Sequence, residues 1–286
     1  MMHIDKLKKE LGARGYDLSL EPVEVTKNKV TCTGIRIIDA SHPNVSPIVY
    51  YSAAETAEMI LERILDAVGR EAPAFVAGKI CDKDYLASHL YLAVSRRGGE
   101  MEDVVAGEYL NLDLIMKVVV SGEIGEQEVG VTKLTHSLLK AAGMTEDEAW
   151  AHAFANTGKT VQVCSIAEAL GIPEDVHGNM QMYVASTNHG SDGASVIAFP
   201  EVLEELCMEK GYEALYVIPS STQEMLVVPY SDAVSVEDLV QMVYEVNTGM
   251  VDPLIQLDPA VYQFTLESRS IVVASTQKGG LGHECL

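Results

Sequence analysis

The sequence predicts an α+β protein in which antiparallel sheets are covered by helices, with recurring ββα units and a C-terminal ββαββα block. Two β-like segments followed by an amphipathic helix recur about three times along the 286 residues. The paired segments are joined by tight turns, which antiparallel strands permit and parallel strands do not. The chain is 48% hydrophobic and 22% charged. This composition is typical of a folded core and excludes wholesale disorder.

The first unit pairs LSLEPVEV with KVTCTGIRII, which alternate apolar with polar or small residues as half-buried strands do. A short apolar run, IVYY, precedes a helix. Ser52 followed by Glu55 three residues later predicts a capping box at its start. The apolar residues at helical spacing are Met59, Ile60, Ile64, Leu65 and Val68, and Gly69 ends the pattern.

The second unit has LIMKVVV as a strand, EVGVTKL as its partner and two helices. The first helix runs roughly over 132–142. The second is capped by Thr145 with Glu148 and ends near Gly158; we expect it to bury Trp150, Ala153 and Phe154. The pair could be a helix-turn-helix, but residues 146–148 of the second helix are all acidic and would repel phosphate. We therefore predict an αα-hairpin that packs on the sheet.

A connector is expected at 161–179, with one short helix that Ser165 caps. The third unit, 180–270, contains MYVAS, the polar turn TNHGSDG, ASVIAF as a strand, and a helix between Pro200 and Gly211. ALYVIP and EMLVVP then form a hairpin. A last helix starts at Ser235 with the buried stripe Leu239, Val240, Met242, Val243 and Val246. We predict parts at 1–160 and 180–270, and a disordered tail at 271–286.

The net charge of −22 is unevenly distributed. Residues 1–143 hold 16 basic and 21 acidic side chains, whereas the rest holds 4 basic and 21 acidic ones. Such a field repels nucleic-acid backbones and anionic membranes. It indicates either a solvated surface or an acidic decoy for a nucleic-acid-binding protein.

Five cysteines with irregular spacing and no CxxC indicate neither a disulfide framework nor a zinc site. Eight histidines include no i, i+4 pair, so we expect no metal. The charged N-terminus resembles no signal peptide, and Asp113 with Lys117 interrupts the most apolar run. A cytoplasmic location is therefore expected.

Residues 153–160, AFANTGKT, satisfy a permissive phosphate-binding-loop pattern. Such a loop requires a strand before it and a helix after it, because the helix N-terminus holds the phosphates. Here the predicted order is reversed. We expect no nucleotide or other cofactor, and we expect Lys159 to be dispensable.

The turn PSSTQE, with Ser220, Ser221 and Glu224, resembles half of a hydrolase site, but no GxSxG elbow accompanies it. Turn chemistry explains each of its residues. Together with Asn188 and His189 of the polar turn, these three residues form our candidate binding surface. No residue is assigned a catalytic role.

Four stretches of the chain resemble a known domain family in their order and spacing. They are VTKLTHSLLKAAGMTEDEAWAHAFANT, GASVIAFPEVLEEL, LYVIPSSTQEMLVVP and MVYEVNTGMVDP. From about Tyr16 to Phe264 the chain resembles a bacterial domain family of unknown function, frequent in Firmicutes and on their mobile elements. That family is distantly similar to a second group of Bacillus-type cytosolic proteins. The resemblance implies a cytoplasmic bacterial or phage protein and supplies no catalytic residues.

Together these observations predict a non-catalytic binding or regulatory module with a protein partner, no direct nucleic-acid binding and no membrane contact. The alternatives are an acidic nucleic-acid mimic that inhibits a DNA- or RNA-binding protein, and a nucleotide-binding or hydrolytic enzyme.

Overall fold

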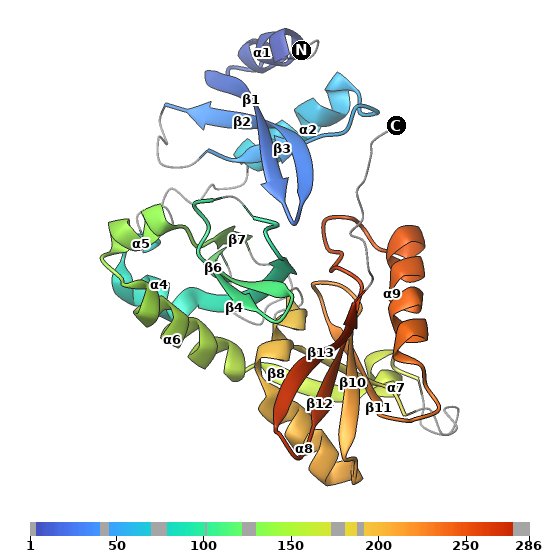
Figure 1. Cartoon of the computed structure of the whole chain (residues 1–286). Coiled ribbons are helices and arrows are strands. Elements are labelled where there is room, and N and C mark those ends of the chain that lie inside the picture. Colours follow the sequence, from blue (N-terminus) through green and yellow to red (C-terminus); the bar gives the residue numbers. More distant parts are fainter. Residues whose placement is uncertain are drawn as a thin grey trace.

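The computed structural model describes residues 4–40, 46–69, 79–100, 102–121, 130–172, 181–187 and 192–276. Its strands form antiparallel sheets, and helices pack against those sheets, so the predicted α+β class is confirmed. Figure 1 shows a three-stranded sheet at one end of the molecule, a four-stranded sheet in the middle and a six-stranded sheet at the other end.

The N-terminal unit is a small sheet covered by two helices. Its elements are α1 (Ile4–Ala13), β1 (Leu18–Lys27), β2 (Val30–Asp39), β3 (Ile48–Tyr50) and α2 (Ala57–Gly69). Their buried cluster comes wholly from residues 7–64, so this unit has a core of its own. The predicted contact between Ser52 and Glu55 exists, but it forms a turn before the helix. Thr56 instead accepts a hydrogen bond from the Met59 N–H at the start of α2.

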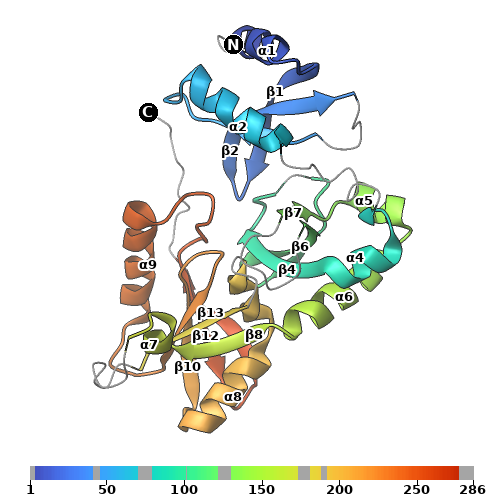
Figure 2. The ribbon, with the colours of Figure 1, turned by 180° about the vertical axis from the view of Figure 1, so that it is seen from behind.

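The middle sheet has the order β4-β6-β5, and β7 pairs with the second half of β6. Its strands are β4 (Leu90–Arg96), β5 (Ala106–Tyr109), β6 (Leu112–Ser121) and β7 (Gly130–Lys133). Its helices are α4 (Lys83–His89), α5 (His136–Ala142) and α6 (Glu146–Gly158). Figure 2 shows α6 alongside β4, and α4, which leads into β4, contacts α6 and β6. The predicted αα-hairpin is confirmed, although α5 begins four residues later than expected, after its cap Thr135.

The buried face of α6 differs from the prediction. Ala149, Ala153 and Thr157 are buried, whereas Phe154 is 37% exposed and Trp150 is only half-buried. Small residues face inward because α6 approaches β4 closely enough for the Leu92 N–H to donate to Thr157 Oγ1 at 2.8 Å. A helix buries the face that can pack against its neighbour, so the bulky aromatic residues lie at the sides.

The six-stranded sheet has the order β13-β12-β10-β11-β9-β8. Its strands are β8 (Val161–Ser165), β9 (Tyr183–Thr187), β10 (Ala214–Pro219), β11 (Met225–Pro229), β12 (Ala260–Thr265) and β13 (Ser270–Thr276). The segment expected to be a connector thus contains β8, followed by α7 (Ile166–Ala169), which Ser165 caps as predicted. The prediction of a disordered tail is wrong for 271–276, which form most of β13.

The segment ASVIAF is not a strand. It forms most of η2 (Gly193–Ala198), a buried 3₁₀-helix, and leads into α8 (Pro200–Lys210). A Cβ at Gly193 would lie 2.2 Å from the Gln223 carbonyl oxygen, so only glycine fits at this contact. η2 fills the space between the middle and six-stranded sheets, where its apolar residues share one buried cluster with both.

The opposite face of the six-stranded sheet is covered by α9 (Val236–Met250), which Ser235 caps as predicted. Its buried residues are Val240, Val243 and Asn247. Two residues of the predicted buried stripe are exposed instead, Met242 by 43% and Val246 by 41%. The inner face of α9 is therefore rotated from the predicted one, and an apolar flank remains in solvent.

One local ion pair gives a pH-dependent prediction. Lys83 Nζ donates to both carboxylate oxygens of Glu148 at 2.8 and 2.9 Å, and the Thr145 N–H donates at 3.0 Å. These hydrogen bonds lower the pKa of Glu148 to about 2. The resulting stabilisation is complete above the unfolded pKa of about 4.3 and is lost as the pH falls toward the folded value.

We expect Lys83→Ala to raise the pKa of Glu148 by at least about one unit, because the lysine makes the largest contribution. An NMR pH titration of the side-chain carboxyl measures this change. Lys140→Ala removes an exposed lysine from α5 and should leave the Glu148 titration where it is. An unchanged Glu148 pKa in Lys83→Ala would contradict the assignment.

Candidate functional site

The structure describes three of the five predicted surface residues. They are Ser220, Ser221 and Glu224, in the turn between β10 and β11. Ser221 Oγ accepts a hydrogen bond from the Gln223 N–H at 3.0 Å, and the Thr222 carbonyl accepts one from the Ala194 N–H at 3.2 Å. The turn is thus held against η2 by its own polar groups. Asn188 and His189 lie outside the described residues, so the grouping of all five stays a prediction.

A buried ion pair that the sequence analysis did not identify lies beside this turn. Asp192 immediately precedes η2, and Lys117 Nζ donates to both of its carboxylate oxygens at 2.7 Å. The Tyr91 hydroxyl donates to the same carboxylate at 3.1 Å. Burial, and then the negative charge of Asp192, raise the pKa of Tyr91. The tyrosine therefore remains a protonated donor.

The chemical role of this triad follows from its hydrogen bonds. Both oxygens of Asp192 are used, and Tyr91 and Lys117 come from neighbouring strands of the middle sheet. The ion pair therefore ties that sheet to η2. The only sequence signals were the interruption of an apolar strand by Lys117 and the presence of Asp192 in a polar turn.

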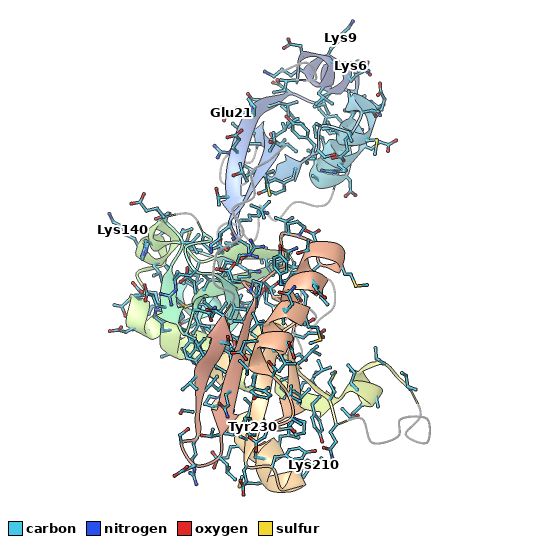
Figure 3. The ribbon with its side chains drawn as sticks, turned by 45° about the vertical axis from the view of Figure 1, so that its right-hand side comes forward. Lys6, Lys9, Glu21, Lys140, Lys210 and Tyr230 are labelled. Atoms are coloured by element: carbon cyan, nitrogen blue, oxygen red, sulfur yellow. The ribbon has the colours of Figure 1, made fainter. Side chains whose placement is uncertain are left out.

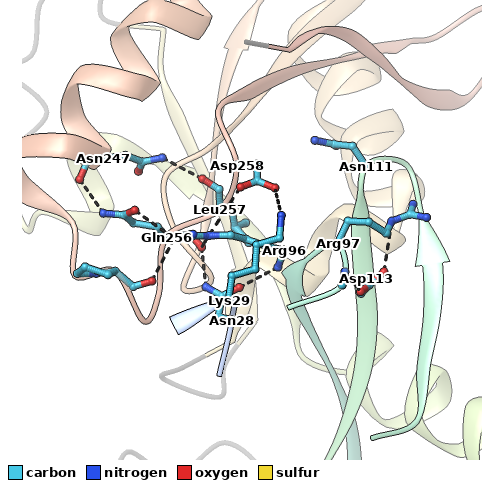
Figure 4. A network of polar contacts seen from close by, with 12 residues as sticks. Asn28, Lys29, Arg96, Arg97, Asn111, Asp113, Asn247, Gln256, Leu257 and Asp258 are labelled. Atoms are coloured by element: carbon cyan, nitrogen blue, oxygen red, sulfur yellow. Dashed lines mark hydrogen bonds and ion pairs between the residues drawn. The ribbon is translucent and has the colours of Figure 1, made fainter. Parts of the chain in front are cut away.

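A second buried network joins all three parts of the chain (Figure 4). Arg96, at the end of β4, is 6% exposed. Its Nε donates to the Gln256 carbonyl, and its Nη2 donates to the Pro253 carbonyl and to Gln256 Oε1, each at 3.1 Å. Burial lowers the pKa of Arg96, and the nearby charge of Asp258 opposes that shift. The loop after α9 therefore supplies the acceptors that this guanidinium requires.

The tip of the β1–β2 hairpin completes the network. Asn28 Nδ2 donates to the carbonyls of Leu254 and Gln256 at 3.1 and 2.7 Å, and its Oδ1 accepts from the Arg96 N–H at 2.8 Å. Asn28 has φ of +50°, a left-handed conformation that asparagine tolerates better than most residues. The described contacts between the N-terminal unit and the loop after α9 are therefore concentrated at this tip.

The same loop supports the end of α9. Gln256 Nε2 donates to the carbonyls of Asn247 and Val251 at 2.7 and 2.8 Å, and Asn247 Nδ2 donates to the Leu257 carbonyl at 2.9 Å. The last carbonyls of a helix lack partners within it, and here a buried side chain supplies the donors. The C-terminal end of α9 is thus fixed through Gln256.

We call Met242, Val246 and Met250 the α9 outer flank. They follow one another at intervals of four residues, which places them along one side of the helix. They are 43%, 41% and 85% exposed. A run of exposed large apolar side chains on one helix differs from scattered single ones, which are ordinary on protein surfaces. The flank is therefore a candidate contact surface.

The described residues do not support a metal site, a membrane-spanning helix or a phosphate-binding loop. Within them, no group of His, Cys, Asp and Glu is arranged to hold a metal ion, and no helix is long and apolar enough to cross a bilayer. Lys159 is the C-cap residue of α6, and β8 follows it. The helix-then-strand order predicted around the phosphate-loop pattern is confirmed, whereas the dispensability of Lys159 stays a prediction.

The hairpin tip gives a prediction with a matched control. Asn28→Gly keeps the left-handed backbone but removes three hydrogen bonds, two of them buried, so it should destabilise the protein by about 2–3 kcal/mol. Lys29 also has positive φ, at +65°, yet within the described residues its side chain makes only an exposed ion pair, with Asp258. Lys29→Gly should therefore change stability by less than about 1 kcal/mol. Urea unfolding compares the two, and equal losses would contradict the role of the Asn28 side chain.

The buried ion pair gives a second prediction. Lys117→Met leaves the carboxylate of Asp192 buried without its cation and should destabilise the protein by about 3–5 kcal/mol. Combining it with Asp192→Asn removes the unpaired charge, so the double variant should recover part of that loss. Denaturant unfolding of the single and double variants measures both. A double variant no more stable than Lys117→Met would show that the carboxylate is not the source of the loss.

Comparison with known proteins identifies the family of the chain but no characterised relative. No curated protein and no solved structure matches the chain. A family model described as a family of unknown function, DUF5688, matches residues 3–265. That span includes the N-terminal unit, the middle sheet, α9 and β12. The chain therefore belongs to the DUF5688 family.

Proposed function

We propose that this protein is a non-catalytic binding module that holds a protein partner on the α9 outer flank. The observation that carries the proposal is the exposure of Met242, Val246 and Met250 on one side of a helix whose other aliphatic residues are buried or partly buried against the sheet. Burying these three side chains against a partner would stabilise the complex by about 25 cal/mol for each Å² of apolar surface removed from water. A free helix flank of this kind suits an amphipathic segment of another protein.

The shape, charge and composition of the flank favour a protein as its binding partner over a small molecule or a membrane. Its residues lie along a convex helix, whereas small ligands are held in concave pockets. The acidic residues of the same helix would repel an anionic lipid surface. Methionine side chains adapt to irregular partner surfaces, because they are unbranched and polarizable.

The buried network around Arg96 supports the binding surface from within. Gln256 holds the last turn of α9, and Arg96 and Asn28 hold Gln256. Leu254, in the same loop, is 39% exposed and lies four residues beyond Met250. A surface that is already ordered loses less conformational entropy when a partner binds.

A designed peptide that presents an apolar helical face to the flank tests the proposal. The probe is an amphipathic helix of about 18 residues, or five turns, with leucine on one face and glutamine on the other. We expect it to bind by fluorescence anisotropy and to lose at least about tenfold in affinity with Val246→Asp, because a charge would then face its leucines. Met208→Asp is the control, since Met208 is 62% exposed on α8.

Two results would contradict this function. One is the absence of saturable binding of the neutral peptide to the unsubstituted protein. The other is an equal loss of affinity in Val246→Asp and Met208→Asp, which would show that any exposed apolar residue suffices. Circular dichroism of both variants shows whether their folds are intact.

A further inference from the structure

We propose that the segment which occupies the α9 outer flank is basic, and that one of its cationic side chains enters a cavity lined by Tyr230 and two glutamates. This inference rests on the proposed function and specifies the chemistry of the partner. Charge complementarity, the nature of the cavity and the position of both on one face of the sheet support it.

The flank lies within a long stretch of sequence that contains acidic residues and no basic ones. Residues 211–268, which contain β10, β11, α9 and β12, hold nine Asp or Glu and no Lys, Arg or His. Two of these acids border the flank directly. Asp238 lies four residues before Met242 and Glu245 lies three residues after it, so both are helix-surface neighbours of that methionine.

These carboxylates are available to a partner. Asp238 and Glu245 are exposed, and neither forms an ion pair with a cationic side chain in the described part of the chain. Some carboxylates elsewhere in the described structure are paired, as Glu148 is with Lys83. A partner with lysine or arginine beside its apolar residues would supply the missing cations, and one with acidic residues would be repelled.

A cavity of about 530 Å³ lies at the ends of β10 and β12. Its lining comprises Glu213, Ala214, Tyr230, Gln263, Thr265, Leu266 and Glu267. The cavity thus offers two carboxylates, a side-chain amide and an aromatic ring, and no cationic side chain is among these lining residues. The hydrogen bond to Asp232, and then the charge of that carboxylate, raise the pKa of Tyr230, so its phenol stays protonated and the ring neutral.

This cavity and α9 share one face of the six-stranded sheet. The Tyr230 ring packs on the Tyr216 ring with their centroids 5.2 Å apart. Tyr216 in turn belongs to the buried cluster beneath α9, together with Val240 and Val243. Figure 3 places Tyr230 toward the same end of the molecule as Lys210, the last residue of α8, and far from Lys6 and Lys9.

The chemistry of the cavity fits a guanidinium or an ammonium group. A cation over the face of a tyrosine ring is attracted by the ring's negative face, and carboxylates at the rim add charge-assisted hydrogen bonds. The aliphatic stem of lysine or arginine packs on apolar surface while its charged end reaches the carboxylates. Arginine suits the site best because its planar group both stacks and donates in pairs.

The experiment compares the neutral peptide with one that carries arginine in place of its glutamines. At low salt we expect the arginine peptide to bind about tenfold more tightly than the neutral one, and the difference to shrink at high salt. Joint substitution Glu213→Gln and Glu267→Gln should weaken the arginine peptide by about threefold to fivefold and leave the neutral peptide unchanged.

A second pair of substitutions controls for net charge. Glu24→Gln with Glu62→Gln removes two exposed carboxylates from β1 and α2 of the N-terminal unit, the same change in charge but at the opposite end of the molecule from the six-stranded sheet. We expect this control to weaken the arginine peptide by less than about twofold. Equal losses in the two double variants would overturn the inference, because attraction would then reflect net charge alone.

The outcomes separate the two proposals. Binding of the neutral peptide with no preference for arginine at low salt overturns the basic partner and retains the protein-binding flank. Binding of the arginine peptide alone, unaffected by Val246→Asp, overturns both and favours an acidic mimic. Binding of both peptides, with the arginine preference reduced in the cavity variant and not in the control variant, supports both.

Discussion

The burial of the Arg96 guanidinium is the constraint on which the arrangement of the three parts depends. A cation removed from water must be surrounded by acceptors, and the described structure supplies them from one loop, through Pro253 and Gln256. That loop then holds the end of α9, and Asn28 of the β1–β2 hairpin binds both the loop and the Arg96 backbone. One buried residue thereby contacts segments about 70 and 160 residues away in the chain, the first through its backbone N–H and the second through its guanidinium.

The parts are joined by different kinds of contact. The middle and six-stranded sheets share one apolar cluster, in which Val94 and Leu112 pack with residues of η2, β10 and β12. The N-terminal unit instead has its own core, and its described hydrogen bonds to the rest are made by the polar hairpin tip. Because the middle and six-stranded sheets share an apolar core, we expect them to unfold together. A small polar contact, such as that of the N-terminal unit, is typical of separately folded units.

The acidic side chains have different surroundings in different parts of the folded chain. Some acids are engaged locally, such as Glu148 in its capping box and Glu204 with Arg269. Those along α9 and around Tyr230 border apolar or aromatic surface instead. Net charge alone accounts for solubility. Carboxylates beside exposed methionines would in addition select the charge of a partner, which is the basis of the function that we propose.

Local chemistry made much of this structure predictable from the sequence alone. The caps at Thr145 and Ser235, the end of α8 at Gly211, the hairpin around Ser221 and the α+β class all follow from interactions within a few residues of the chain. The tertiary structure alone decided which sides of α6 and α9 are buried, that residues 193–198 form a 3₁₀-helix, and that Lys117 pairs with Asp192. These features depend on the shape and charge of segments distant in sequence, because a helix with apolar residues on several sides buries only the side that a neighbour can pack against.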